Sequence, residues 1–182
     1  FYPVDIAIPD NNEAEFFSVA KRLGTSELRF LYPSASLAAQ KKHEHPDWNV
    51  GVLSSQPNEI RKAKHRELFS ATSSNEIAVL ESSPDIIFGV ERIPPKDGLH
   101  ARHSGLNHVL CALVARKGTA LGLSFNLLLN APPPTRQVLI GRMRQNALLA
   151  RKNKLTALPL SCAHSPFELR SREDLQAWLC SL

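Results

Sequence analysis

The sequence predicts an α/β protein in which parallel strands alternate with helices around a barrel. Two observations support this prediction: strand-like and helical segments alternate along the 182 residues, and no repeat or linker interrupts them. Parallel neighbours need crossover helices, and the strand count of about seven favours a compact TIM-barrel-like (β/α) barrel over an open sheet. Since such barrels usually have about 250 residues, we expect short loops and incomplete closure, with an eighth strand missing or contributed unconventionally.

Strand and helix signals alternate through the first half of the chain. Residues 2–8 alternate polar and branched side chains, and Asn11 or Asn12 can cap a helix that ends at Leu23, before Gly24. Further elements are expected at 28–32 (strand), 34–42 (short helix), 50–53 (strand), 67–71 (strand) and 74–81 (helix). Residues 77–80 alone also have the pattern of a strand, so this stretch keeps two interpretations.

The second half gives stronger signals. An apolar strand at 85–90 is followed by a loop at 93–98, and Ser104 is a good N-cap for a helix that ends at Lys117 and Gly118. The apolar stripe expected on that helix comprises Leu106, Val109, Leu110, Leu113 and Val114. The remaining elements are expected at 119–125 (strand), 135–152 (long helix after three prolines), 155–162 (strand) and 172–180 (helix).

Charge is distributed very unevenly along the chain. Residues 1–91 contain nine Lys and Arg against thirteen Asp and Glu, a formal charge of −4, whereas residues 92–182 contain thirteen against four, a charge of +9. Between Asp97 and Glu168 there is no carboxylate at all, and nine Lys or Arg occur there. Since a surface of one sign attracts polyanions, this asymmetry favours nucleic acid as the partner.

Composition sets further limits on the kind of protein. With 182 residues and 43% hydrophobic residues, the chain is expected to form one domain over 1–182 with a real core. No apolar run approaches the ~20 residues that cross a bilayer, and no signal-peptide pattern begins the chain, so we expect a cytoplasmic protein without membrane contact. The cysteines Cys111, Cys162 and Cys180 are odd in number and lack CxxC spacing, so we interpret them as buried small hydrophobic residues.

Four sequence blocks resemble a known family in their order and spacing. They are His103 to Leu110, Gly122 to Phe125, Gly141 to Asn146 and Ser165 to Ser171, and the opening Phe1 to Asp5 resembles the first strand of that family. Together they are similar to the thirty-kilodalton-type protein subunit of archaeal ribonuclease P, protein component 3. The combination of blocks is specific, whereas any one alone is a weak signal.

The resemblance implies a TIM-barrel-like subunit of an endoribonuclease that removes the 5′ leader from precursor tRNA. It implies that the catalytic RNA, with Mg²⁺, supplies the chemistry, so the isolated chain is expected to have no catalytic residues and to bind no metal or cofactor. The implied partners are ribonuclease P RNA and other ribonuclease P protein subunits, especially a small one that bridges this chain to the RNA. Contact with precursor tRNA is expected to be indirect.

The candidate RNA-binding residues are basic side chains near the ends of the late elements. They are Arg102, His103, His108, Arg116, Lys117, Arg142, Arg144, Arg170 and Arg172. Arg102 and His103 precede a helix whose N-terminus can bind an anion, but Ser104 can equally be only a cap. Likewise, Arg116 and Lys117 can simply complement a helix C-terminus, and Arg170 and Arg172 begin a helix whose dipole disfavours them.

Two enzymatic alternatives remain open at this point. The first is a metal-dependent phosphoesterase of the polymerase and histidinol phosphatase barrel superfamily, which has His-x-His at the end of its first strand. Here that strand has no histidine, and His43-Glu44-His45 lies in a polar stretch after a helix. The second is a sugar-phosphate enzyme, but the late strands end in Ser124, Asn126, Ser161 and His164 rather than in acids or a lysine.

Overall fold

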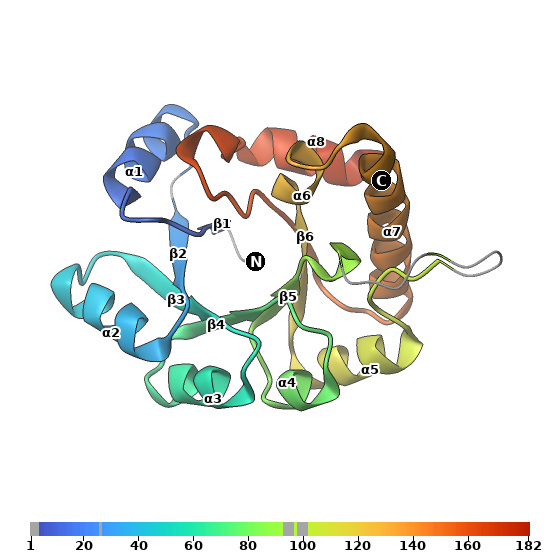
Figure 1. The fold of residues 1–182 in the computed structure, drawn as a ribbon, viewed down its shortest axis with the longest axis horizontal. Helices are drawn as coiled ribbons and strands as arrows, with labels where there is room; N and C mark the ends of the chain where they lie inside the picture. Colours follow the sequence, from blue (N-terminus) through green and yellow to red (C-terminus); the bar gives the residue numbers. More distant parts are fainter. Residues whose placement is uncertain (1–3, 26, 93–96, 98–101) are drawn as a thin grey trace.

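Seven parallel strands form a barrel-like sheet in which each strand pairs with the next one along the chain (Figure 1). The computed structural model describes residues 4–25, 27–92, 97 and 102–182. Its strands are β1 (Asp5–Ala7), β2 (Leu28–Tyr32), β3 (Asn49–Leu53), β4 (Phe69–Thr72), β5 (Ile86–Phe88), β6 (Ala120–Ser124) and β7 (Ala157–Leu160). All six pairings are parallel, and the TIM-barrel-like fold expected from the sequence is confirmed.

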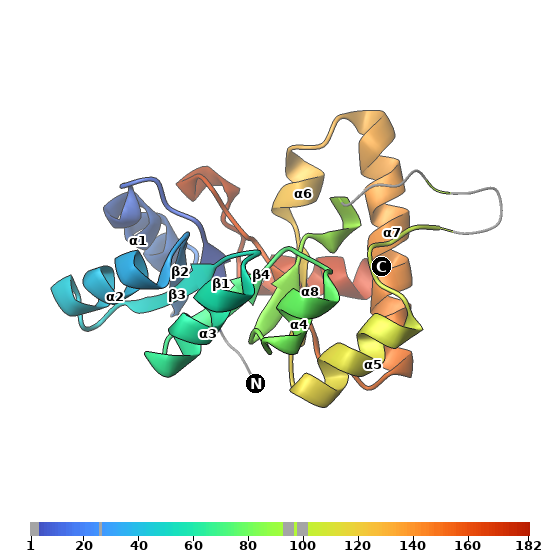
Figure 2. The ribbon, with the colours of Figure 1, turned by 60° about the horizontal axis from the view of Figure 1, so that its bottom comes forward.

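Helices connect the strands and surround the sheet (Figures 1 and 2). They are α1 (Glu13–Arg22), α2 (Ala35–Glu44), α3 (Pro57–His65), α4 (Ile77–Glu81), α5 (His108–Lys117), α6 (Asn126–Leu129), α7 (Pro133–Lys152) and α8 (Arg172–Ser181), with 3₁₀ turns η1 (Val90–Arg92) and η2 (Pro166–Glu168). The helical interpretation of 74–81 is confirmed, since α4 lies there. The sequence analysis missed α3 and α6, and the loop expected at 93–98 lies outside the described residues except for Asp97.

The start of α5 corrects two expectations. The helix begins at His108, and its N-cap is Asn107, whose side-chain oxygen accepts a hydrogen bond from the Leu110 N–H at 2.9 Å. Ser104 is buried three residues earlier, and its hydroxyl donates to the Leu106 carbonyl. The buried face also differs from the predicted stripe, because Val109 is 57% exposed and Cys111 is buried. The C-terminal glycine was predicted correctly, because Gly118 has φ of 71°.

Hydrophobic side chains fill both sides of the sheet. Alternate strand residues point into the barrel and come from every part of the sheet, among them Ile6, Leu31, Ala71 and Ile86. Gly122 makes room there, because a Cβ at this position would lie 2.7 Å from a methyl group of Leu160.

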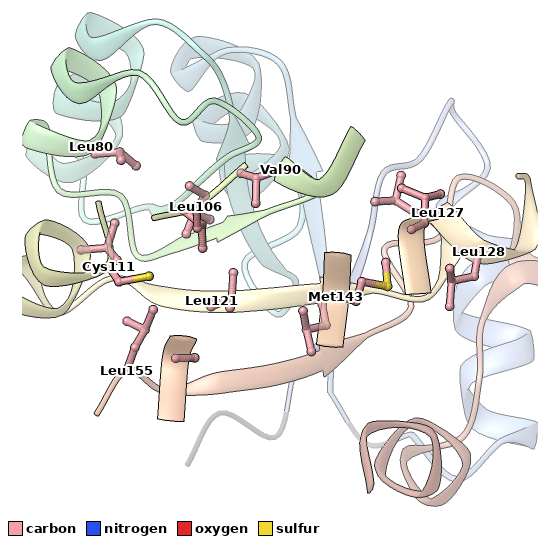
Figure 3. Close-up of a cluster of buried hydrophobic side chains, with 14 of the residues drawn as sticks. Leu80, Val90, Leu106, Cys111, Leu121, Leu127, Leu128, Met143 and Leu155 are labelled. Atoms are coloured by element: carbon pink, nitrogen blue, oxygen red, sulfur yellow. The ribbon is translucent and has the colours of Figure 1, made fainter. Parts of the chain in front are cut away.

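A second cluster packs β5 and β6 against α4, α5, α6 and α7 (Figure 3). Its labelled side chains are Leu80, Val90, Leu106, Cys111, Leu121, Leu127, Leu128, Met143 and Leu155. Cys111 and Cys162 are buried as expected, but the expectation was wrong for Cys180, which is exposed on the last turn of α8. No helix in the described part of the chain has the length and apolar character needed to cross a membrane.

The barrel closes only in part, at the seam between β1 and the segment that follows β7. Ala7 and Ala163 form one parallel bridge, in which the Ile8 N–H donates to the Ala163 carbonyl at 2.8 Å and the Ala163 N–H donates to the Ile6 carbonyl at 3.1 Å. One further contact comes from the Asp5 carboxylate, which accepts the Ser161 N–H at 2.7 Å. The described sheet has seven strands, as the expected incomplete closure requires, and the Asp5 side chain provides part of the contact across the seam.

Asp5 is itself almost fully buried at the seam. Burial raises the pKa of this carboxyl group, against the effect of its hydrogen bonds with Ser161 and Ile6. The same oxygen, Oδ1, accepts both the Ser161 N–H and the Ile6 N–H, the latter at 2.8 Å. One side-chain oxygen therefore satisfies two main-chain donors that lie on the two sides of the seam.

Replacement of Asp5 should destabilise the barrel more when the new side chain has no oxygen to accept the Ile6 and Ser161 N–H groups. Asp5→Ala leaves two buried N–H groups without their acceptor, so we expect a loss of about 2 kcal/mol in the free energy of unfolding, whereas Asp5→Asn should lose less than about 1 kcal/mol. Urea denaturation of the three proteins measures both values. Equal losses in the two variants would contradict the role of the Asp5 oxygen.

Candidate nucleic-acid interface

The outer face of α7 presents basic side chains to solvent. Its inner face comprises Leu139, Met143 and Ala150, which are buried, with Ala147 half-buried beside them. Arg144 and Arg151 are seven residues apart, so they lie on one exposed face. We call the following group of exposed basic residues on and beside α7 the α7 surface: Arg102, His103, His108, Arg144, Arg151 and Lys152.

Arg102 reaches the α7 surface from the chain segment before α5. One of its guanidinium nitrogens donates to the Gly141 carbonyl at 3.1 Å, and its own carbonyl accepts from the Gln145 side chain at 3.2 Å. A Cβ at Gly141 would lie 2.7 Å from this guanidinium, so a larger residue there would displace the Arg102 side chain. The two hydrogen bonds place Arg102 beside the turn of α7 that carries Arg144, although the two residues are far apart in the sequence.

Carboxylates are absent from the α7 surface. The elements that form it lie between Asp97 and Glu168, a stretch without Asp or Glu. Of the two nearest acids before it, Glu91 is buried, and Asp97 is paired with Arg142 while also accepting the His103 N–H and interacting with the Arg102 charge. Within the described residues, the three ion pairs belong to Glu13, Glu59 and Asp97, and none includes a member of the α7 surface. This region therefore keeps its positive potential, which suits a polyanion.

The other predicted residues are not members of the α7 surface. Arg116 and Lys117 are exposed in the last turn of α5, roughly 12 Å from His108 along the helix axis. Arg170 and Arg172 lie next to η2 and α8, beside the seam. Hydrogen bonds place Arg102 and His103 beside the part of α7 that carries Arg142 and Arg144, and His108 begins α5. The RNA-binding role of all nine stays a prediction.

Arg142 occupies a different environment from Arg144, two residues away. It is only 7% exposed, and its guanidinium binds one Asp97 carboxylate oxygen through two nitrogens, at 2.8 and 3.0 Å. A third nitrogen donates to the Glu91 carbonyl at 2.8 Å. Burial alone would raise the pKa of Asp97, but hydrogen bonds from the His103 N–H and Arg142, together with the Arg142 charge, lower it. Arg142 therefore joins α7 to the segment that follows η1.

Asn146, one turn beyond Arg142, continues this internal contact. Its amide nitrogen donates to a Glu91 carboxylate oxygen and to the Ser104 carbonyl, both at 2.8 Å. Burial raises the pKa of Glu91, opposed by the Asn146 hydrogen bond and the Arg142 charge. The second Glu91 oxygen and the Asn146 oxygen are both buried without a hydrogen-bond partner. A neutral Glu91 carboxylic acid suits these surroundings better than a carboxylate does.

A second polar cluster lies beyond the ends of β6 and β7. The Glu168 carboxylate accepts from the side chains of Asn126 and Asn130 and from the N–H groups of His164 and Ser165. The Asn126 side chain, just after β6, is therefore held by a hydrogen bond to Glu168. The sequence analysis names Asn126 among the residues at the strand ends when it weighs a sugar-phosphate enzyme.

The η2 turn held by this cluster presents an aromatic side chain that the sequence analysis did not single out. Phe167 is 84% exposed, while its neighbours Pro166 and Leu169 are buried. Arg170 donates to the Phe167 and Leu169 carbonyls at 3.0 and 2.7 Å and lies over the Phe125 ring. Its guanidinium is therefore partly used within the protein. No sequence pattern distinguishes Phe167 from a core phenylalanine, because exposure depends on the path of the turn.

The described residues show no metal-binding cluster. No group of three or more His, Cys, Asp or Glu in the described part of the chain is placed to hold a metal ion. His43 and Glu44 belong to the last turn of α2, and His45 stacks on Trp48 with ring centroids 3.8 Å apart. The His-x-His spacing thus lies at a helix end rather than at the end of a strand.

Comparison with known proteins supports the resemblance seen in the sequence. The chain is 29% identical over 133 residues to ribonuclease P protein component 3 of Thermococcus kodakarensis, covering 69% of this chain and 57% of that protein. It is 37% identical over 76 residues to the protein of the same name from Methanosarcina acetivorans, covering 42% of this chain and 32% of that protein. The chain is similar to ribonuclease P protein component 3. No family model matches it.

A solved structure contains a chain with a fold similar to that of this protein. A chain in the cryo-EM structure of archaeal ribonuclease P with mature tRNA matches with a TM-score of 0.70 and 20% identity, covering 98% of this chain and 82% of that one. The curated relatives are longer, and this chain spans little more than half of the first of them. The resemblance predicted from the four sequence blocks is confirmed.

Arg142 and Arg144 should respond differently to replacement by alanine. Arg142→Ala leaves the partly buried Asp97 carboxylate and the Glu91 carbonyl without their partner, so we expect a loss of about 3 kcal/mol in the free energy of unfolding. Arg144→Ala removes an exposed side chain and should change that free energy by less than about 0.5 kcal/mol. Urea denaturation separates the two cases, and equal stabilities would show that the Arg142 contacts do not hold α7.

Glu91 should make stability depend on pH. Because its pKa is raised in the folded state, that state keeps a proton which the unfolded state has lost, and stability falls as pH rises through this range above 4.5. Glu91→Gln keeps a neutral partner for Asn146, so it should be more stable than the wild type at pH 8, with the difference shrinking toward pH 4. Thermal melting across this range measures the effect. A constant difference at all pH values would mean that Glu91 does not titrate abnormally.

Proposed function

We propose that this chain is a protein subunit of ribonuclease P that supports the catalytic RNA in removing the 5′ leader from precursor tRNA. The observation behind the proposal is the carboxylate-free α7 surface on a fold similar to a chain of archaeal ribonuclease P. The similarity to ribonuclease P protein component 3 supports the same assignment. The enzyme in this proposal is the complex, and the chemistry belongs to the RNA and its Mg²⁺.

RNA phosphates are the proposed ligands of the α7 surface. Arg102 and Arg144 supply permanent positive charges, and Arg151 adds another on the same face of α7. Each can neutralise one phosphate with release of counterions, without the cost of breaking an ion pair. Arg142 is not included, since its guanidinium is buried against Asp97. Contacts of this kind position an RNA but do not read its sequence.

Other parts of the proposal concern partners and location. Ribonuclease P RNA and the other protein subunits are the proposed partners, with a small subunit bridging this chain to the RNA. The acidic first half of the chain, residues 1–91, is the proposed contact for a basic partner. Cytoplasmic location is proposed together with the function. A metal-dependent phosphoesterase is not favoured, because His43 and His45 lie away from the strand ends.

Arginine replacements on the α7 surface should weaken RNA binding without loss of folding. Arg102→Ala and Arg144→Ala should each lower the affinity for ribonuclease P RNA and reduce the slope of log K against log salt by about one. Filter binding at several salt concentrations gives the slope, and cleavage of precursor tRNA by the reconstituted complex gives the activity. Lys21→Ala, an exposed residue of α1 in the acidic half, is the matched control.

Two outcomes would contradict the proposal in different ways. If Arg102→Ala and Arg144→Ala behave like Lys21→Ala while the wild type binds RNA, the assignment of the α7 surface is wrong and the subunit role stands. If the chain alone cleaves phosphodiesters with Mg²⁺ or Mn²⁺ and loses this activity on replacement of His43 and His45, the phosphoesterase alternative is correct.

A further inference from the structure

Two basic runs lie in the half of the chain that is acidic overall. Residues 41–43 read Lys-Lys-His, and residues 61–66 read Arg-Lys-Ala-Lys-His-Arg. Residues 41–66 contain six Lys and Arg against three Asp and Glu, whereas the rest of residues 1–91 contains three against ten. The charge of −4 over the whole half therefore combines a basic part of charge +3 with acidic parts of charge −7.

The fold brings the two runs together at the ends of two neighbouring helices. Since α2 connects β2 to β3 and α3 connects β3 to β4, the two helices run in the same direction, and they pack side by side. Glu59 joins their first turns, because its carboxylate accepts the Ala35 N–H at 2.9 Å. The Ala35 carbonyl accepts from the Arg66 side chain, also at 2.9 Å, so this flank of α2 faces α3. Lys42, seven residues after Ala35, lies on the same flank at the other end of α2.

The basic side chains at these helix ends are exposed. Ile60 and Ala63 form the buried face of α3, so the charged residues between and after them point outward. We call the following exposed group the α2–α3 surface: Lys42, Arg61, Lys62, Lys64, His65 and Arg66. Figures 1 and 2 show α2 and α3 on the side of the barrel away from α7, with α4 and α5 between α3 and α7. The chain therefore has two separate basic surfaces.

Hydrogen bonds to uncharged groups hold part of the α2–α3 surface in place. Lys42 donates to the Pro46 and Trp48 carbonyls, each at 2.7 Å. Arg61 donates to the Asn58 side-chain oxygen at 3.2 Å. Because these acceptors carry no charge, they position the two cations without neutralising them.

Acidic side chains neutralise little of this surface. Within the described residues, one ion pair includes a member of it, between Lys62 and Glu59 at 2.7 Å. Glu44, which is exposed on α2, accepts instead from the Gln40 side chain at 2.8 Å. Glu67, exposed just after α3, takes part in none of the ion pairs of the described chain. The other members of the surface can therefore bind an anion without the cost of breaking an ion pair.

The helix dipole explains only some of these basic residues. Lysine and histidine in the last turn of a helix stabilise its C-terminus, and Lys62, Lys64 and His65 lie in the last turn of α3. Arg61 lies in the middle of α3, outside the last turn that this effect reaches. A ligand of opposite charge accounts for all of them.

RNA suits the α2–α3 surface better than an acidic protein does. The large hydrophobic side chains that are exposed in the described part of the chain belong to α1, α4, α5, α7 and η2, and none lies on α2 or α3. A protein interface has an apolar core inside a polar rim, whereas a nucleic-acid interface is more polar and much more positively charged. The α2–α3 surface therefore has the composition of a nucleic-acid interface.

We propose that the α2–α3 surface binds the phosphates of a second RNA segment, so that this chain contacts ribonuclease P RNA on two sides of its barrel. The inference rests on the proposed ribonuclease P function, and it adds a contact in the half of the chain whose overall charge predicts none. Arg61 and Lys64 bind phosphates from α3, and Lys42 adds a contact from α2. The remaining acidic parts of residues 1–91 are left for a basic partner protein.

Lysine footprinting of the wild-type protein tests this contact directly. The reconstituted complex, with and without ribonuclease P RNA, is treated with a limiting amount of an acetylating reagent, and mass spectrometry measures the modification of each lysine. We expect the RNA to lower the acetylation of Lys64 severalfold, and that of Lys152 on the α7 surface likewise, while Lys21 at the end of α1 stays unchanged. Equal acetylation of Lys64 with and without RNA would overturn the proposal.

A charge-neutral variant measures the contribution of the same contact to binding. Arg61→Gln combined with Lys64→Gln should reduce the slope of log K against log salt by about two and raise the Kd for ribonuclease P RNA at low salt at least about tenfold. The matched control, Lys21→Gln combined with Arg22→Gln, removes the same charge from exposed positions in the last turn of α1 and should change neither value. Thermal melting checks that both variants fold, and the footprint of the wild type decides the matter if one of them does not.

The outcomes separate this proposal from the proposed function. If Arg102→Ala and Arg144→Ala reduce the slope while the α3 variant behaves like its control, the α2–α3 contact is wrong and the α7 surface stands. If polyglutamate protects Lys64 as well as RNA does at equal charge concentration, the surface binds an acidic protein instead. If none of these variants changes the slope, both RNA contacts are wrong.

Discussion

The Arg142 guanidinium determines where α7 lies and, with it, the position of the basic surface. It binds the Asp97 carboxylate through two nitrogens and the Glu91 carbonyl through a third, and Asn146 adds bonds to the Glu91 side chain and the Ser104 carbonyl. These contacts connect one helix to chain segments 42 to 55 residues away. Directional polar bonds fix the rotation of α7 about its axis, which apolar packing alone fixes less strictly.

That rotation has a direct consequence for the outer face of α7. With Arg142 and Asn146 turned inward, Arg144 and Arg151 are necessarily turned outward, because they lie about half a helical turn away. The same geometry brings Gly141 to Arg102. The buried polar contacts and the exposed basic residues are therefore two sides of one arrangement, and a change to the first should disturb the second.

The seam between β1 and the segment that follows β7 is only partly closed. The seven-stranded sheet has two edge strands, β1 and β7. The Asp5 side chain and a single bridge join β1 to the segment that follows β7. Next to this contact, Val4 and Asp5 line a cavity together with residues of β7 and α8. Pro159 lies in the edge strand β7 and has no N–H to donate to a neighbouring strand. This limits pairing of β7 with strands of other molecules.

The sequence by itself determined the class of fold, most of the helices and strands, and the positive charge of the second half of the chain. Alternating apolar patterns located β2, β6 and α7 closely, and the stretch without Asp and Glu made the second half basic whatever the fold. Local patterns failed where a distant partner decided the outcome. Ser104 has the chemistry of an N-cap, yet the Asn146 bond to its carbonyl holds it in the core and leaves the cap to Asn107.

Only the tertiary structure decided which arginines remain accessible and where the barrel stays open. Arg142 and Arg144 are chemically identical in the sequence, and one became a buried partner of Asp97 because the helix can turn only one of them inward. Phe167 is exposed and Cys180 lies on the surface for the same kind of reason, the path of η2 and the orientation of α8. Whether a side chain is buried depends on how the whole chain packs. Residue type and spacing could therefore predict that a basic surface exists, but not which individual residues belong to it.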